Sequence, residues 1–474
     1  TPGSTKKKAR LVAKGFSQKQ GIDFEETFAP TVGKSTIRTV MSYASANGWA
    51  LEQADVDTAF LNATLKEDIY MTLPEGIYLI PDSPCAPTPS LLDESRRTGK
   101  QVAVKLHRAL YGLKQSPRAW RQKLTSILSE LGYSPSICNP GAYFQVVNGR
   151  IFCILLVYVD DILIACHNKH TATVFKDQLS KHVKIKDLQE CKHILGISVR
   201  RDSTGIYLSQ SQVIHQLLLD NNMQNCRPAP VPITAAYMQG HVWSGGETAG
   251  ASAGANHLDN SHTATTANQH GVQLPYSSVS VQIAQDINSH APSSYSSTAV
   301  THDSHDKSQS DLSAADQSKF QSILGVILYI STCTRPDLSF AVSVLCRKMK
   351  QATDKDMDAL KHLLRYLKGT KDEELALGKR QQGLTGFSDA SYADCRTTRR
   401  SSAGYLFLFM GGTVSWKSNL LKTIALSTAE AEYMALSASA QEGVYLQQHI
   451  TELKLTEGGI VQGSNTDSTN TNSY

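Results

Sequence analysis

The sequence predicts an α+β protein with more than one domain. Its 474 residues exceed the length that one hydrophobic core usually organises. Helical and strand-like hydrophobic patterns alternate up to about residue 225, helical stripes return after residue 317, and a strand, strand, helix pattern begins near residue 383. The expected architecture is therefore a large α+β domain, a helical segment and a small α/β domain.

The first expected domain covers residues 1–232. Residues 35–47 have the spacing of a helix, and residues 48–60 suit a strand followed by a turn. The apolar run 151–159 is too short for a membrane helix, which needs about 20 apolar residues. The sequence therefore predicts a soluble α+β domain that makes no use of a membrane.

A low-complexity insertion is expected at residues 233–317. The segment is rich in Ser, Thr, Ala, Gly and Asn, and no Lys or Arg occurs from Pro228 to Asp306. Large apolar side chains are too few to offset the entropy of ordering, so we expect a disordered or loosely ordered segment. Metal binding by its histidines is the alternative, but their spacing is irregular and they lack cysteine partners. The seven histidines are His241, His257, His262, His270, His290, His302 and His305.

Order is expected to return in a helical segment at residues 318–372. Apolar residues recur there every three or four positions, which is the period of a helix that buries one face. Arg335 followed by Pro336 is a helix-start signature between the first two stripes. The three stripes are Phe320, Ile323, Leu324 and Ile327; Leu338, Ala341, Val342 and Leu345; and Met357, Leu360, Leu364 and Leu367.

The last expected domain covers residues 383–474. Strands are predicted at 384–388 and 403–409, and a helix follows at about 429–453. The residues after this helix are rich in Ser, Thr and Asn and have little strand character.

The long C-terminal helix has its own start signal and its own apolar side. Ser427 and Glu430 have the spacing of a capping box, in which each residue satisfies a backbone N–H near the other. The expected buried stripe consists of Tyr433, Leu436, Ala440 and Val444.

The net charge and the cysteine content limit the classes of protein to which the chain can belong. There are 47 Lys and Arg against 42 Asp and Glu, a net charge of +5. Residues 228–306 hold five of the acids and no Lys or Arg, so the remainder carries +10, a basic body that suits a polyanion. Nine scattered cysteines without a C-x-x-C pair argue against a disulfide scaffold and predict reduced thiols in the cytoplasm or nucleus. The chain begins at Thr1 without a secretory signal, which we interpret as a piece of a longer polypeptide.

Two acidic elements carry the chemistry. Residues 151–165 place Asp160 and Asp161 between two apolar runs, which predicts a hairpin with both carboxylates at its tip. Consecutive strand residues point to opposite faces, so a turn is needed for both carboxylates to serve one site. Asp55 ends a second strand-like run, and three such carboxylates suit Mg²⁺ and two-metal phosphoryl transfer. An acidic turn without a catalytic role is the alternative.

The sequence from Tyr158 to Asp161 resembles the Y-x-D-D box of reverse transcriptases. Its setting resembles the Pol polyprotein of Copia-type (Pseudoviridae) long-terminal-repeat retrotransposons, and the similar stretches span about residues 6–230 and 318–370. The resemblance implies a right-hand polymerase with fingers, palm and a helical thumb or connection, followed by a partial α/β ribonuclease H-like domain. The other similar stretches are residues 8–16, 25–30, 55–62, 110–120, 194–197 and 334–337.

The resemblance assigns the metal ligands of the polymerase. It implies that Asp55, Asp160 and Asp161 hold Mg²⁺ or Mn²⁺ ions. Such ions polarise the primer 3′-hydroxyl and neutralise charge on the leaving pyrophosphate.

The resemblance also implies a set of nucleotide contacts. Phe60 resembles an aromatic gate beneath the sugar, where a 2′-hydroxyl would collide, and a plain core phenylalanine is the alternative. Lys8, Arg10 and Lys14 lie on an expected strand that places Lys8 and Arg10 on one face. Gly112 would let the backbone approach a base closely. The implied nucleotide contacts are Lys8, Arg10, Phe60, Gly112, Lys114 and Gln115.

The C-terminal domain resembles a ribonuclease H, an enzyme class that also uses paired metal ions. Asp389 is expected at the end of the first strand, and Glu432 is expected in the helix as a second metal ligand. The family pattern then requires a strand that ends in Asp. Asp467 has about the right spacing, but residues 458–472 lack strand character, so this domain is expected to be incomplete.

Two functions from different classes remain open. The first is an RNA-directed and DNA-directed DNA polymerase whose partners are an RNA template, a DNA primer, an RNA–DNA hybrid and deoxynucleoside triphosphates, in cytoplasmic virus-like particles or the nucleus. The alternative is a catalytically inactive retroelement relic that acts at most as a nucleic-acid-binding protein. The three polymerase aspartates favour the first, whereas the insertion and the Ser/Thr/Asn-rich end favour the second.

Overall fold

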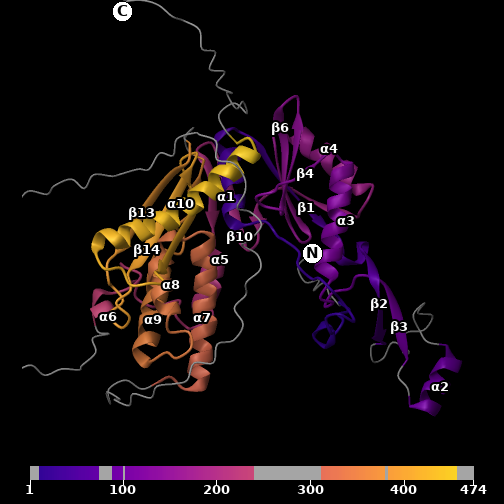
Figure 1. Cartoon of the computed structure of the whole chain (residues 1–474), viewed down its shortest axis with the longest axis horizontal. Helices are drawn as coiled ribbons and strands as arrows, with labels where there is room; N and C mark the ends of the chain where they lie inside the picture. Colours follow the sequence, from indigo (N-terminus) through magenta and orange to yellow (C-terminus); the bar gives the residue numbers. More distant parts are fainter. Residues whose placement is uncertain (1–9, 74–87, 100–101, 240–310, 379–382, 456–474) are drawn as a thin grey trace, which may run out of the picture. The chain divides into compact units, whose positions relative to one another are not determined.

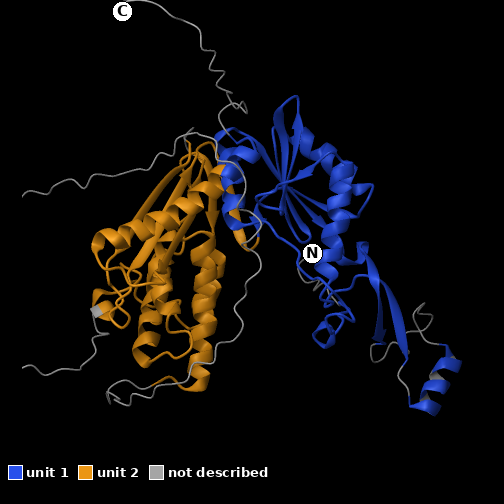
Figure 2. Ribbon diagram, in the orientation of Figure 1, with its two compact units in different colours: residues 1–194, 448–474 blue, residues 195–447 orange. Residues whose placement is uncertain are grey.

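The computed structural model describes residues 10–73, 88–99, 102–239, 311–378 and 383–455. The chain has the predicted α+β composition and divides into two compact units (Figure 2). Unit 1 comprises Thr1–Ile194 and Gln448–Tyr474, and unit 2 comprises Leu195–Gln447.

Unit 1 is built around a six-stranded sheet in which all neighbouring strands are antiparallel. The strand order is not the chain order, because β1 is inserted between β7 and β8. In spatial order the strands are β4 (Ser134–Pro135), β5 (Ala142–Val147), β6 (Arg150–Tyr158), β7 (Asp161–Cys166), β1 (Ala50–Val56) and β8 (Ile185–Glu190).

Helices cover this sheet because its central strands are apolar on both faces (Figure 1). Residues Ile162 and Ile164 of β7 join the core that α3 (Ser116–Glu130) and α4 (Lys169–Ser180) complete. The alternate residues of β7 are equally buried, and α1 (Lys34–Ala46) contacts β1 and β7. This double burial explains why residues 151–165 form near-continuous apolar runs.

The remaining elements of unit 1 are short. The chain before α3 includes 3-10 turns, a two-stranded antiparallel sheet of β2 and β3, and one helix between those strands. Residues 10–14, which were expected to form a strand, are irregular, and the Ala13 N–H donates to the Tyr111 carbonyl (2.8 Å) outside any sheet. The elements are η1 (Gly15–Ser17), η2 (Ala59–Asn62), β2 (Thr64–Thr72), α2 (Pro89–Thr98), β3 (Ala103–Arg108) and β9 (His193–Ile194).

The helices of unit 2 form the predicted apolar core. All twelve residues of the three predicted stripes are buried, and they pack together with residues of α5. The expected helix start at Pro336 is a 3-10 turn that leads into α8, and Thr353 with Asp356 caps α9. The elements are α5 (Ser211–Asp220), α6 (Ala235–Gln239), α7 (Ala314–Cys333), η4 (Pro336–Leu338), α8 (Ser339–Cys346) and α9 (Asp354–Gly369).

The expected insertion at 233–317 lies mostly outside the described residues, which omit 240–310. Its described flanks include α6 and the first turn of α7. Ile233 and Tyr237 pack against the helical core of unit 2, so the preceding flank contributes to that core.

The strands of unit 2 form two antiparallel groups. β11 (Gly205–Ser209) pairs with β10 (Ile197–Asp202) and with β12 (Leu375–Leu377). A three-stranded sheet of β13 (Thr385–Ser391), β14 (Ser402–Phe409) and β15 (Gly412–Leu420) precedes α10 (Thr428–Glu452). Two of these three strands were predicted. The sequence analysis missed β15, whose polar residues alternate along an edge strand.

The Ser427 half of the predicted α10 cap is present, whereas the Glu430 carboxylate binds the N–H of Leu426 instead of that of Ser427, and the expected apolar stripe is wrong. The Glu430 N–H donates to Ser427 Oγ (3.1 Å), and the Glu430 carboxylate accepts the Leu426 N–H (2.6 Å). Tyr433 is 72% exposed, and Leu436, Ala440 and Val444 are exposed as well. The buried side carries Ala431, Ala435 and Leu446 instead. Its alanines have the small side chains that let a helix pack closely on a sheet, as Ala435 does against Ala403 of β14.

None of the described helices is both long enough and apolar enough to cross a membrane.

Candidate active site

The strand order of unit 1 brings three aspartates together. β6 and β7 pair so that Tyr158 faces Asp161, which leaves Val159 and Asp160 as a two-residue turn. β1 lies on the other side of β7, and its register pairs Asp55 with Asp161. Paired residues of antiparallel strands lie on one face with their Cβ atoms about 4.5–5.5 Å apart. Asp55 and Asp161 therefore share a face, and Asp160 lies at the adjoining tip.

The turn has a conformation that its sequence does not favour. Val159 has φ +60°, whereas Asp160 is not among the residues with positive φ. This sign pattern belongs to a type II′ turn, whose first central position favours glycine. Two hydrogen bonds hold the strained valine in place. The Trp120 indole N–H donates to the Val159 carbonyl (2.7 Å), and the Val56 N–H donates to the Asp160 carbonyl (2.9 Å).

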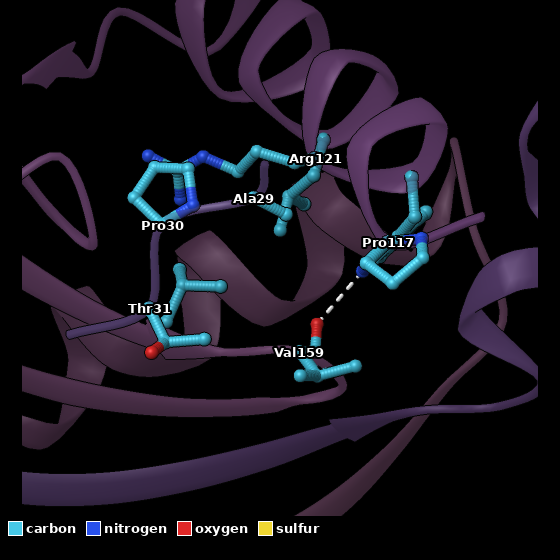
Figure 3. Close-up of a pocket in the computed structure, with 9 residues that line it drawn as sticks. Ala29, Pro30, Thr31, Pro117, Arg121 and Val159 are labelled. Atoms are coloured by element: carbon cyan, nitrogen blue, oxygen red, sulfur yellow. Dashed lines mark hydrogen bonds between the residues drawn. The ribbon is translucent and has the colours of Figure 1, made fainter. Parts of the chain in front are cut away.

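A small, largely apolar pocket adjoins the turn, and the dashed line in Figure 3 marks the bond to Val159. The pocket lies between the start of α3 and the segment 29–31. Its lining residues are Ala29, Pro30, Thr31, Pro117, Trp120, Arg121, Leu124, Val157 and Val159.

The three carboxylates repel one another. Burial raises the pKa of the Asp161 carboxyl, and the charges of Asp160 and Asp55 raise it further. The Gln53 amide, which donates to Asp161 Oδ1 (3.4 Å), opposes this rise. A cation bound between these carboxylates would remove the repulsion that raises the pKa of Asp161.

The donor set fits a hard divalent cation. Mg²⁺ and Mn²⁺ take oxygen ligands, and all three groups are carboxylates. Within the described ranges, no three His, Cys, Asp or Glu side chains converge enough to hold an ion as they stand. The aspartates are thus neighbours whose side chains would need to rotate to complete coordination. Asp57 is a different case, because its carboxylate pairs with Lys184 Nζ (2.9 Å).

Phe60 packs on Tyr111, a residue that the sequence analysis missed. The two ring centroids are 4.7 Å apart, and both side chains are half-buried. Burial raises the pKa of the Tyr111 hydroxyl, the Asp160 carboxylate raises it further, and Arg10 opposes the rise. Tyr111 therefore lies in the field of both the aspartates and Arg10. The sequence signal that could have identified Tyr111 is its position directly before Gly112, in the implied nucleotide loop.

Gly112 lies where the backbone passes very close to another segment. Its φ is +92°, and a Cβ atom at this position would collide with the carbonyl oxygen of Ala13. Gly15 makes the reciprocal approach, because a Cβ there would collide with the carbonyl oxygen of Gly112. The glycine requirement therefore comes from packing of the protein on itself.

The side chains of Lys114 and Gln115 differ in exposure and therefore in their access to a ligand. The Lys114 side chain is exposed, and its ammonium group donates to the Gln18 carbonyl (3.1 Å) and lies 4.9 Å from the Phe24 ring centroid. Gln115 is 3% exposed, and its amide donates to the Asp23 carbonyl (3.0 Å) and accepts from Gln18 (3.0 Å). The Gln115 side chain therefore ties this loop to the N-terminal segment.

The two remaining implied nucleotide contacts lie near the start of the chain. Arg10 is described and exposed, whereas Lys8 lies outside the described residues.

Comparisons with known proteins identify the family of the chain. The family described as "Reverse transcriptase (RNA-dependent DNA polymerase)" matches residues 3–235. The Pol polyprotein of transposon TNT 1-94 from Nicotiana tabacum is 34% identical over 94% of the chain, and that of transposon RE1 from Arabidopsis thaliana is 30% identical over 98%. The chain belongs to the Copia-type Pol family. It spans about a quarter of these relatives, with 28% of the tobacco protein and 26% of the Arabidopsis protein covered.

The second predicted site of this Copia-type chain is described in part. Asp389 lies in β13, opposite Gly404 of β14, and its side chain is exposed. Glu432 lies near the start of α10 and is also exposed. Asp467 lies outside the described residues. The structure thus describes two of the three carboxylates that the sequence analysis assigned to this site.

Proposed function

We propose that this Copia-type chain is an RNA-directed and DNA-directed DNA polymerase that uses Mg²⁺ or Mn²⁺ at Asp55, Asp160 and Asp161. The observation that carries the proposal is the strand register, which sets Asp55 opposite Asp161 next to the turn that contains Asp160. Membership of the family supports it, because two relatives and the family description name Pol polyproteins or a polymerase.

The parts of a right-hand polymerase would then be distributed over both units. The six-stranded sheet with α3 and α4 would act as the palm, and β2 with β3 would belong to the fingers. Helices α7, α8 and α9 would act as the thumb or connection.

The residues of the site have separate tasks in this mechanism. The bound metal would activate the primer 3′-hydroxyl and offset charge on the leaving pyrophosphate. Asp55 and Asp161 would hold it from adjacent strands, and Asp160 would add a third carboxylate from the turn. Phe60, supported by Tyr111, would lie beneath the sugar. Arg10 and Lys114, both exposed, would contact the triphosphate.

Asp160→Asn and Asp55→Asn test the proposal by primer extension on poly(rA)·oligo(dT) with Mg²⁺ or Mn²⁺. Either change should lower extension by at least about 10³-fold, the scale on which loss of a central catalytic group acts. Primer–template affinity should change by less than about twofold, because phosphate contacts come from basic side chains.

Asp57→Asn is the matched control. Asp57 lies two residues from Asp55, but its carboxylate pairs with Lys184, so extension should persist. If the parent extends primers and either site variant does so at a near-normal rate, the site is wrongly assigned. A folded parent that extends no primer with either ion would favour the inactive relic.

The proposal includes a ribonuclease H-like domain in residues 383–474. The order of three antiparallel strands followed by a helix supports it, together with Asp389 on β13 and Glu432 on α10. Its substrate would be the RNA strand of an RNA–DNA hybrid.

A further inference from the structure

We infer that the Trp120 indole N–H is a positioning group for Asp160. It selects the orientation of the Val159–Asp160 peptide that keeps the Asp160 carboxylate at the hairpin tip next to Asp55 and Asp161. The catalytic consequence of this inference rests on the proposed function. The orientation of the peptide itself can be tested in protein that shows no polymerase activity. Trp120 belongs to α3 and lies outside the set of carboxylate ligands.

The peptide between Val159 and Asp160 has two accessible orientations. Two-residue hairpin turns adopt type II′, with positive φ at the first central residue, or type I′, with positive φ at both. The two types differ mainly in the direction of the central carbonyl. The observed turn has positive φ at Val159 alone. The alternative would place Asp160 at positive φ, a conformation that Asp adopts more readily than most residues.

Trp120 distinguishes these two orientations. Its N–H donates to the Val159 carbonyl, which is the carbonyl that reverses when the peptide rotates (Figure 3). Trp120 is 2% exposed and packs in the core of the sheet, so solvent has little access to its indole N–H. An unsatisfied buried donor disfavours the rotated turn by a factor of roughly 5 to 150 in population. The second bond, from the Val56 N–H to the Asp160 carbonyl, fixes the other end of the turn.

Rotation of this peptide would affect metal binding and, through it, catalysis. A rotated peptide changes the backbone angle at Asp160 and therefore the direction of its carboxylate. Without the indole N–H, a fraction of molecules would present two carboxylates in place of three. Metal affinity should fall, whereas contacts to primer, template and nucleotide made by other residues should stay.

Trp120→Phe tests this inference, with Trp416→Phe as the matched control. Trp416 also donates its indole N–H to a backbone carbonyl, that of Ser331 (2.9 Å), but it lies in unit 2. In metal-free protein, hydrogen exchange of the Val56 amide should be about tenfold faster in Trp120→Phe than in the parent. Mn²⁺ affinity, measured by electron paramagnetic resonance of the free ion, should fall by about tenfold. Trp416→Phe should match the parent in both measurements.

Kinetics add a readout that a packing defect would not produce. In Trp120→Phe, the Mg²⁺ concentration for half-maximal extension should rise about tenfold, while the KM for deoxynucleotide stays within about twofold. Val56 exchange or Mn²⁺ affinity equal to that of the control would overturn the inference. An unchanged Mg²⁺ requirement in an active enzyme would also overturn it. If exchange and Mn²⁺ affinity change as expected but the parent extends no primer, the positioning role stands and the proposed function fails.

The unmutated protein gives a second test, should Trp120→Phe not fold. Metal binding and the observed turn should favour each other, because coupling between two equilibria is reciprocal. Saturating Mg²⁺ should therefore slow exchange of the Trp120 indole proton in ¹⁵N spectra several-fold and leave that of Trp416 unchanged. Equal behaviour of the two protons would overturn the inference.

Discussion

At the scale of single residues, the site keeps an unfavourable arrangement of charge. Burial and two neighbouring carboxylates raise the pKa of Asp161. A carboxyl with a raised folded-state pKa destabilises the folded protein fully above that pKa, and the destabilisation shrinks as pH falls from it towards the pKa of the unfolded state, below which it is absent. Clusters of like charge with shifted pKa values are common at functional sites.

Asp161→Asn should therefore stabilise the metal-free protein at pH 7 while it abolishes primer extension. Removal of one like charge at a half-buried position is worth on the order of 0.5–1 kcal/mol, which corresponds to a rise in Tm of about 1–4 °C. Calorimetry in EDTA measures the difference between variant and parent. The gap should shrink towards the ordinary Asp range of about pH 4, where the parent carboxyl is protonated. A lower Tm for the variant at pH 7 would contradict this account.

Phe60→Val should allow ribonucleotides to be incorporated. Loss of the ring opens space below the sugar, and the half-buried position limits the cost in stability compared with a full core site. The measurement is the ratio of kcat/KM for deoxyribonucleotide to that for ribonucleotide, which should fall by about tenfold or more. An active variant that discriminates as strictly as the parent would identify Phe60 as a core residue that packs on Tyr111 and has no role in sugar selection.

At the scale of elements, the sequence predicts the helices and strands whose apolar pattern is compatible with only one arrangement. The helical stripes of unit 2 are of this kind, because their apolar residues lie on one side of each helix. The acidic hairpin is another case, because its two continuous apolar runs are buried on both faces and are interrupted only at the turn. α10 has apolar residues on two sides, and the alanines that face the sheet give a weaker signal than Tyr433 or Val444. Residues 10–14 contact a segment distant in sequence, at Tyr111, which no local pattern reveals. β15 pairs with the preceding strand β14 across a two-residue turn, but its many polar, partly exposed residues gave no apolar pattern to detect.

Gly112→Ala should disrupt the implied nucleotide loop. The new Cβ would collide with the Ala13 carbonyl oxygen, and positive φ adds strain. Gly149→Ala is the matched control, because Gly149 also has positive φ (+77°) but has no atom within 4 Å of an added Cβ. Gly149→Ala should cost about 1 kcal/mol of unfolding free energy, and Gly112→Ala should cost at least twice as much and raise the KM for nucleotide. Equal effects of the two changes on stability and KM would show that the close approach does not matter.

At the scale of the whole molecule, the two proposed activities have unequal support. Sequence patterns identified Asp55, Asp160 and Asp161 separately, but their convergence depends on β1 lying between β7 and β8, a strand order that local patterns do not specify. The second site has Asp389 and Glu432 on regular elements, whereas Asp467 lies outside the described residues.

Ribonuclease H activity should therefore be weak or absent even if the polymerase works. A metal site needs its carboxylates on rigid elements, and the sequence around Asp467 has almost no strand character. The assay is release of labelled fragments from an RNA–DNA hybrid, with Asp389→Asn as the control for contaminating nuclease. Robust cleavage that disappears in the control would show that Asp467 or another group completes the site.

The pairing of β1 with β7 also limits which insertions and deletions a copy of this gene can acquire without losing the aspartate cluster. Side chains alternate along a strand, so the loss or gain of one codon within Ala50–Val56 would turn Asp55 to the opposite face, whereas the same change at the Gly149 turn would be absorbed outside the site. A copy freed from selection would lose its aspartate cluster through such length changes while its helices still packed. Unbroken spacing between Ala50 and Asp55 would therefore mark a recently functional copy better than overall sequence identity does.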